Sequence, residues 1–182
     1  MTDSESKAKA DTAGALYEFV GGQINRLEHR PNEKAVWRHA FARGLYEGQS
    51  SLKAWSLLQR DIPDELLEKY PAGKAEIAAY IALAAYAACG SHKSGISLGE
   101  AAGKAGGGMR ERFTRVELSA DIESLWANLK APLRIISSKG GSGIDYRLLA
   151  KDVFYWQKDS LKAAMYWERN YYRDNKKNKE ED

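Results

Sequence analysis

A long apolar segment near the middle of the chain constrains the fold more than any other feature. Residues 74–89 read KAEIAAYIALAAYAAC, which is apolar on nearly every side of a helix. A helix of this kind outside a membrane has to be surrounded by other helices. The segment is shorter than the roughly 18 uninterrupted apolar residues that a bilayer requires. The sequence therefore predicts a central buried helix, and no membrane partner.

The hydrophobic pattern on both sides of this segment predicts further helices. Apolar residues recur three and four positions apart, which is typical of one buried helical face. The predicted helices span residues 12–29, 32–43, a short stretch that ends before residue 61, 97–104, a stretch that starts at 109, 121–136, and 146–172 as one bent helix or two consecutive ones. No alternating run of β-branched residues indicates a strand. We expect an all-α fold with no sheet.

Glycine and charge divide the chain into regions. Ten of the sixteen glycines lie between residues 90 and 143, so loops are expected to concentrate there. We expect a seam near residue 92, with one small helical bundle over residues 12–92 and a second over residues 93–174, packed together. Residues 1–11 are small and polar and residues 175–182 are almost wholly charged. Both ends are therefore expected to be disordered.

Residues that typically form catalytic or metal sites are sparse. The single cysteine, Cys89, permits no internal disulfide and ends a buried helix, which favours an inert thiol over a hydrolase nucleophile. The three histidines, at positions 29, 39 and 92, lack metal-ligand spacing. The segment GEAAGKAGGG has the wrong glycine interval for a phosphate loop. We therefore expect no enzyme activity, metal or cofactor, and the N-terminal segment, which is not a secretory signal, favours a cytoplasmic location.

Positive charge is unevenly distributed along the chain. The 28 basic and 25 acidic residues leave a net charge of only +3, which by itself does not indicate nucleic-acid binding. Residues 26–43 and residues 93–115 each carry an excess of three positive charges. Residues 130–139 contain Lys130, Arg134 and Lys139 and no carboxylate. The basic residues therefore gather in patches that a folded chain can bring together.

The C-terminal helix carries the clearest of these patches. Four cations fall within about 60° of arc if the helix is continuous. They are Lys158, Lys162, Arg169 and Arg173. A stripe of this kind is roughly 22 Å long and can follow several phosphates. The alternative interpretation is a solvated face that Asp159 and Glu168 partly neutralise. Most aromatic residues are predicted to be core, but Tyr166 lies beside the stripe and can stack on a base.

Two shorter patterns add further candidate cations. Arg112 and Arg115 lie on the outer side of the helix that follows a glycine hinge, and Lys34 and Arg38 form a similar pair near the N-terminus. Arginine can hold a phosphate through two parallel hydrogen bonds. Each pair alone is weak evidence for a nucleic-acid site.

Several motifs occur in order from Ser94 onwards. They are SGISLGEAAGKAGGG, MRERFTRVELSA and GIDYRLLAKDVFYWQKDSLKAAMYWERNYY. In this order they resemble the CasB family, the small subunit of the type I-E CRISPR surveillance complex called Cascade. The resemblance covers roughly residues 12–174 and is stronger over residues 94–172. It implies a non-catalytic antiviral-defence protein of two helical bundles, present in two copies. The implied partners are the backbone and large subunits of Cascade, the crRNA and target DNA, including the displaced non-target strand.

The resemblance also implies which cations bind RNA or DNA. His39 stands where the family usually has a second arginine after Arg38, and Lys34 is expected to substitute for it. Arg110 aligns with a family position only to within one residue. The complete set of expected binding residues, with those from the helical stripes added, is Lys34, Arg38, Lys74, Arg110, Arg112, Arg115, Lys158, Lys162, Arg169 and Arg173.

We expect these side chains to converge in the folded protein into one continuous cationic track that holds phosphates without reading base sequence. The alternative is a helical scaffold whose basic patches bind only acidic protein partners.

Overall fold

The computed structural model describes residues 3–67, 73–106, 108–139 and 142–180, with side chains from residue 12 to residue 173. These residues form helices throughout, as predicted, and the only β-type contact among them is an isolated bridge between His92 and Ile144. The elements are α1 (Asp3–Glu28), α2 (Pro31–Phe41), α3 (Gly48–Asp61), the 3-10 turn η1 (Asp64–Leu66), α4 (Lys74–Cys89), α5 (Leu98–Ala105), α6 (Met109–Glu117), α7 (Ile122–Ser138), α8 (Tyr146–Trp156) and α9 (Ser160–Glu180).

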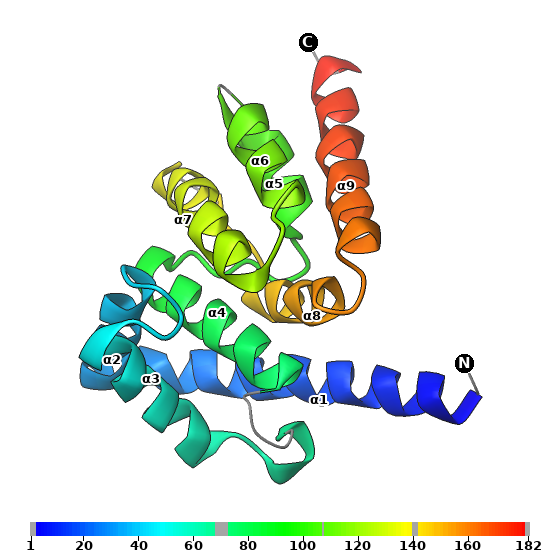
Figure 1. Ribbon diagram of the computed structural model, residues 1–182. Coiled ribbons are helices and arrows are strands. Elements are labelled where there is room, and N and C mark those ends of the chain that lie inside the picture. Colours follow the sequence, from blue (N-terminus) through cyan, green and yellow to red (C-terminus); the bar gives the residue numbers. More distant parts are fainter. Residues whose placement is uncertain (1–2, 68–72, 107, 140–141, 181–182) are drawn as a thin grey trace.

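Helix α4 is the centre of one group of helices, as its apolar sequence predicts. Every side chain from Ala75 to Ala87 is buried. Helices α1, α2, α3 and α8 pack around it, and α7 contacts it from the other group (Figure 1). The carboxylate of Glu76 is buried in the first turn, where it accepts hydrogen bonds from the Gly73 backbone nitrogen at 2.6 Å and from Gln59 at 2.5 Å. Glu76 therefore has hydrogen-bond partners inside the core, as buried polar groups require.

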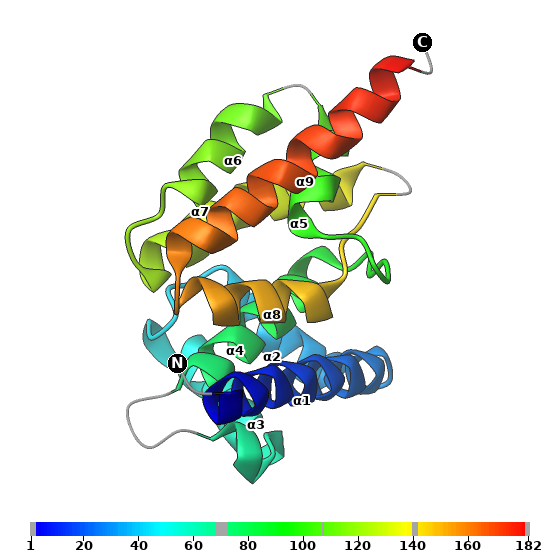
Figure 2. The same ribbon diagram turned by 90° about the vertical axis from the view of Figure 1, so that its right-hand side faces the viewer.

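The second group consists of α5, α6, α7 and α9, which lie above α8 in Figure 1. Helix α8 follows α7 in the chain, yet it packs against α1 and α4 and lies between the two groups in both views (Figure 2). A division into two bundles at residue 92 stays a prediction. Helix α8 comes after residue 92 in the chain but packs on helices that come before it. One continuous set of buried apolar side chains extends from α1 to α9.

Both ends of the described chain are helical, and the disorder that we expected for residues 1–11 and 175–182 stays a prediction. Helix α1 begins at Asp3 rather than near residue 12, and α9 continues to Glu180. Extending an existing helix by one residue avoids the unfavourable nucleation step. The added segments are also rich in alanine, lysine and glutamate, which favour helix. The expected disorder of residues 1, 2, 181 and 182 lies outside the described residues.

Helices α8 and α9 are separate, because the chain turns between Trp156 and Ser160. Asp159 caps the start of α9, where its carboxylate accepts a hydrogen bond from the Lys162 backbone nitrogen at 2.9 Å. Lys158 therefore lies in the turn before α9.

The glycine-rich segment that begins α5 is a helix-packing surface. A Cβ atom added at Gly99 would lie 2.3 Å from the carbonyl oxygen of Trp167, and one added at Gly103 would lie 2.5 Å from that of Tyr171. Only glycine permits backbones to approach this closely. Helix α5 therefore lies directly against α9, and it positions the outward face of that helix.

A buried carboxylate fastens the start of α8 to the loop that precedes α5. Asp145 has no exposed side-chain surface and accepts hydrogen bonds from the Arg147 guanidinium at 2.7 Å and from the Gly95 backbone nitrogen at 2.9 Å. The Tyr146 hydroxyl donates to the carbonyl oxygen of Gly90 at 2.6 Å. Burial acts to raise the pKa of Asp145, but the bonds from Arg147 and Gly95 hold it below its ordinary value.

Candidate nucleic-acid interface

The outward face of α9 is the most continuous exposed basic surface among the predicted residues. Helix α9 packs through residues that include Ala163, Trp167 and Tyr171. Its opposite side carries four exposed residues within about 60° of arc at 100° per residue. These residues, which we call the α9 basic face, are Lys162, Tyr166, Arg169 and Arg173.

The cations of the α9 basic face are not neutralised by carboxylates. Among the described side chains, no ion pair within 4.0 Å involves Lys162, Arg169 or Arg173. Asp159 caps the helix, and Glu168 forms an ion pair with Arg110 on α6 at 3.1 Å. The two carboxylates that could have neutralised the stripe are therefore engaged elsewhere.

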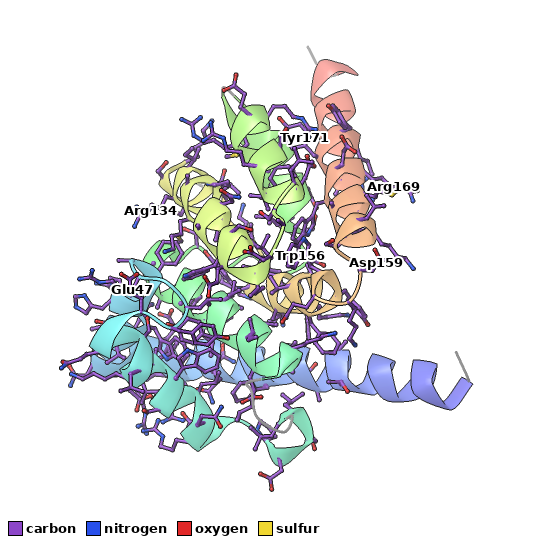
Figure 3. All side chains as sticks on the ribbon, viewed as in Figure 1. Glu47, Arg134, Trp156, Asp159, Arg169 and Tyr171 are labelled. Atoms are coloured by element: carbon purple, nitrogen blue, oxygen red, sulfur yellow. The ribbon has the colours of Figure 1, made fainter. Side chains whose placement is uncertain are left out.

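The α9 basic face extends over 12 residues, from Lys162 to Arg173, or about 16 Å along the helix axis. In Figure 3, Arg169 points outward from α9, on the side away from α5 and α6. Tyr166 lies between the cations with 49% of its surface exposed. The arrangement combines positive charge with an exposed aromatic ring, which are the two elements that hold a single strand without sequence preference.

Lys158 does not continue this face as the sequence predicted. Its ammonium group lies 3.6 Å from the centre of the Phe154 ring and 5.6 Å from that of Tyr155, both on α8. The predicted stripe assumed a continuous helix, and the turn before Ser160 removes Lys158 from the α9 wheel.

Arg110 is partly exposed, but its guanidinium is engaged by carboxylates of the same chain. Its guanidinium forms ion pairs with Glu117 at 3.2 Å and Glu168 at 3.1 Å, and lies 5.3 Å from the ring centres of both Tyr171 and Tyr172. The group is thus an internal link between α6 and α9. Phosphate binding there would have to compete with two carboxylates.

Arg112 and Arg115 are exposed, but they do not extend the α9 basic face. On α6 they lie about 160° and 140° around the helix from Arg110, which faces α9. Arg112 also donates to the carbonyl oxygen of Gly108 at 2.8 Å. These two arginines form a separate, smaller patch.

The three predicted residues of the N-terminal half lie in the other group of helices. Lys34 forms an ion pair with Glu28 at 3.0 Å, and its ammonium group lies 4.8 Å from the centre of the Tyr86 ring. Arg38 is exposed and donates to the carbonyl oxygen of Ala87 at 3.3 Å. Lys74 is the first residue of α4 and is half-buried. One continuous track through all ten predicted residues is therefore not formed.

The structure also brings together cations that sequence reasoning did not select. Lys130 and Arg134 on α7 lie against the end of α2 and the loop after it, where Lys130 donates to the backbone carbonyl of Arg43 and Arg134 lies over the Phe41 ring. The signal available in the sequence was the segment from residue 130 to residue 139, which has three cations and no carboxylate.

The remaining candidate groups are the single cysteine and the possible metal ligands. Burial raises the pKa of the Cys89 thiol to about 11, so the nucleophilic thiolate is scarce at neutral pH. In the described part of the chain, no three histidine, cysteine or carboxylate side chains are arranged to hold a metal ion. None of the described helices has the length and apolar character needed to cross a membrane.

Comparison with solved structures shows what the fold resembles. A Cse2-family CRISPR-associated protein from Thermus thermophilus matches with a TM-score of 0.66 and 18% identity, covering 88% of this chain and 97% of that one. CasB from Thermobifida fusca matches with a TM-score of 0.62 and 19% identity, over 90% and 97% of the two chains. CasB from M. ruber matches with a TM-score of 0.66 and 20% identity, over 86% and 94%.

Sequence comparison supplies the family. No curated protein sequence matches this chain significantly. The family model described as CRISPR-associated protein Cse2 matches residues 38–172, which is well over half of the chain. The motifs that suggested the resemblance, and all but two of the ten predicted cations, lie within that range. The chain therefore belongs to the CRISPR-associated Cse2 family, also called CasB, the small subunit of the type I-E Cascade complex.

Proposed function

We propose that the α9 basic face binds the backbone of nucleic acid within Cascade and holds the displaced DNA strand without reading its sequence. The observation that supports this proposal is the exposure of Lys162, Arg169 and Arg173 on one side of a helix with no carboxylate paired to them among the described side chains. Tyr166 adds a ring on which a base of any identity can stack.

A surface that binds phosphates and does not recognise bases is suited to the displaced DNA strand. When a guide RNA pairs with one DNA strand, the other strand is left single and can have any sequence. Contacts to phosphates position such a strand but carry no sequence information. Because the exchange of duplex for heteroduplex is nearly balanced, a few additional phosphate contacts shift it towards the open state.

The proposed role is binding without catalysis. The raised pKa of the Cys89 thiol, which makes its thiolate scarce at neutral pH, supports this part of the proposal. We further propose that the chain acts as two copies in contact with crRNA and with the backbone and large subunits of Cascade, as the family resemblance implies.

The direct test removes the charge of the α9 basic face. The triple variant Lys162→Gln, Arg169→Gln and Arg173→Gln, in assembled Cascade, should bind a displaced strand more weakly and with less salt dependence. Each phosphate contact on a single strand contributes about 0.7 to the slope of log affinity against log salt, so the slope should fall by about 2. Binding is measured by fluorescence anisotropy across a salt series.

A matched control loses the same charge elsewhere. The variant Lys53→Gln, Lys93→Gln and Lys104→Gln removes three exposed lysines outside the α9 basic face. It should keep the wild-type slope. Equal slopes for wild type and the α9 variant, with both proteins folded, would overturn the proposal and favour the scaffold that binds only acidic proteins.

A further inference from the structure

A second group of cations lies where α2 and the loop after it meet α7. The carbonyl oxygen of Arg43 accepts a hydrogen bond from the Lys130 ammonium group at 2.7 Å. The Arg134 guanidinium lies 5.4 Å from the ring centre of Phe41, which ends α2. Arg38 is one turn before Phe41 on the same helix. We call Arg38, Arg43, Lys130 and Arg134 the α2–α7 basic surface.

Two cations of this surface are neighbours on α7, and none of the four is in a direct ion pair with a described carboxylate. Lys130 and Arg134 are one helical turn apart on α7, where their Cβ atoms are about 6 Å from each other. Among the described side chains, none of the four cations forms an ion pair within 4.0 Å with a carboxylate. Lys130 and Arg134 repel each other, Glu47 offsets part of that repulsion without forming an ion pair with Lys130, and a bound anion would relieve the rest.

The protonation of Lys130 reflects this environment. Burial, and then the charge of Arg134, lower the pKa of its ammonium group, while Glu47 acts in the opposite direction. The Lys130 side chain is also fixed in place, because it donates to Arg43 and lies 5.0 Å from the centre of the Trp126 ring. The surface therefore presents pre-positioned cations, which an anion can bind at a low cost in side-chain entropy.

The α2–α7 basic surface is separate from the α9 basic face. Figure 3 shows Arg134 on the outer side of α7 and Arg169 on the outer side of α9, at opposite sides of the molecule, with α5 and α6 between the two helices. A short strand bound to one surface therefore leaves the other unoccupied.

An exposed aromatic pair borders the same surface. Tyr46, in the loop that contains Arg43, has 57% of its surface exposed and stacks on Trp55 with a ring distance of 5.7 Å and an angle of 4°. Trp55 is held by a hydrogen bond to the carbonyl oxygen of Leu45 at 2.8 Å and stacks on Tyr80 in the core. Burial, and then the charges of Glu123 and Glu76, raise the pKa of Tyr46, so the ring contributes stacking rather than a cation contact. An exposed ring still favours an unpaired nucleic-acid strand over an acidic peptide, since only the former gains from stacking.

We propose that the α2–α7 basic surface is a second site for the phosphate backbone of single-stranded nucleic acid, independent of the α9 basic face. The protein then has two opposed sites and can hold two separate stretches of nucleic acid at once. This inference goes beyond the proposed function, which requires only the α9 basic face.

Lysine footprinting tests the proposal directly. The purified full-length protein is acetylated at low salt with and without a short oligothymidine, and each lysine is quantified by mass spectrometry. Lys130 should be protected by the oligonucleotide, whereas Lys53, an exposed lysine on α3 outside both surfaces, should not be. Equal acetylation of Lys130 with and without oligonucleotide would overturn the proposal.

Variants of each site can be distinguished by the number of oligonucleotides that one chain binds. Native mass spectrometry should find two short oligonucleotides on the wild-type chain and one on the variant Arg43→Gln, Lys130→Gln and Arg134→Gln. The charge-retaining variant Lys130→Arg and Arg134→Lys should bind two, which controls for lost packing against Phe41 and Trp126. A melting curve verifies that each variant is folded.

The outcomes for the two sites are distinguishable. If only the α9 triple variant loses an oligonucleotide, the α2–α7 site is wrong and the α9 proposal stands. If only the α2–α7 variant loses one, the α9 proposal is wrong. If the α2–α7 surface binds a polyglutamate peptide and no oligonucleotide, it is a protein-docking surface and the second nucleic-acid site is overturned.

Discussion

At the scale of the residue, Arg110 shows why a cation in a basic segment need not be available to a ligand. The sequence places it among the basic residues near position 112, but in the fold it links Glu117 on its own helix to Glu168 on α9. Glu168 is 58 positions away along the chain, so no local pattern reveals the pairing. By contrast, the availability of Lys162 and Arg169 follows from helical periodicity alone, because the packed residues of α9 lie on the other side.

The buried carboxylate of Asp152 should make the free energy of unfolding depend on pH. Its carboxylate is buried between α8 and α9 and accepts a hydrogen bond from the Trp167 indole nitrogen at 2.8 Å. Burial raises the pKa of Asp152 from 3.8 to about 7. Between these values the folded protein holds a proton that the unfolded chain has released. The free energy of unfolding should therefore fall as pH rises from about 4 to about 7, by about 4 kcal/mol at most.

The variant Asp152→Asn isolates this effect. The amide can still accept from Trp167 but does not ionise, so the variant should lose less stability than wild type between pH 5 and pH 8. Other groups also titrate: His92, whose pKa is lowered by burial, acts in the opposite direction. Their contributions cancel in the difference between the two proteins. Urea unfolding at each pH measures that difference, and parallel curves for the two proteins would contradict the account.

At the scale of the element, the close contact of α5 with α9 determines how the α9 basic face is presented. Gly103→Ala should destabilise the protein by about 2 kcal/mol. The added methyl group would overlap the backbone of Tyr171, and moving either helix to make room would disturb its packing. Gly22→Ala on α1 is the matched control. No atom lies within 4 Å of the added methyl group there, so the better helix propensity of alanine should stabilise the protein by up to about 1 kcal/mol. Thermal denaturation measures both, and a stabilising Gly103→Ala would refute the packing role.

The sequence predicts which segments form helices better than it predicts how the helices pack. The buried helix α4 was predictable because its composition leaves no polar face, and α7 because its apolar residues keep one arc. The crossing of α8 into the other group of helices depends on which surfaces are left uncovered after folding, which no single segment encodes. Likewise, a helix over residues 97–104 was predictable, but the contact that Gly99 and Gly103 make with α9 was not, because that helix comes more than 50 positions later in the chain.

At the scale of the whole molecule, the fold places cations on opposite sides rather than in one track. The number of basic residues in each segment was readable from the sequence. Their grouping was not, because Arg43 and Lys130 come from different halves of the chain and meet only through tertiary contacts. The net charge of +3 hides this arrangement, because it adds the cations of these surfaces to charges that cancel in ion pairs, such as that of Arg26 with Glu33 and Asp61.

The central claim is that the α9 basic face contacts the displaced strand in the assembled complex. A photo-crosslinking amino acid in place of Tyr166 tests this most directly, in Cascade bound to a target whose two strands carry different labels. We expect crosslinks to the displaced strand, equally for two targets of unrelated sequence, and none from a control probe in place of Glu65, which is exposed in η1 and lies outside both basic surfaces. Absence of crosslinks at Tyr166 in a complex that has opened its target, or crosslinks only to protein, would contradict the account.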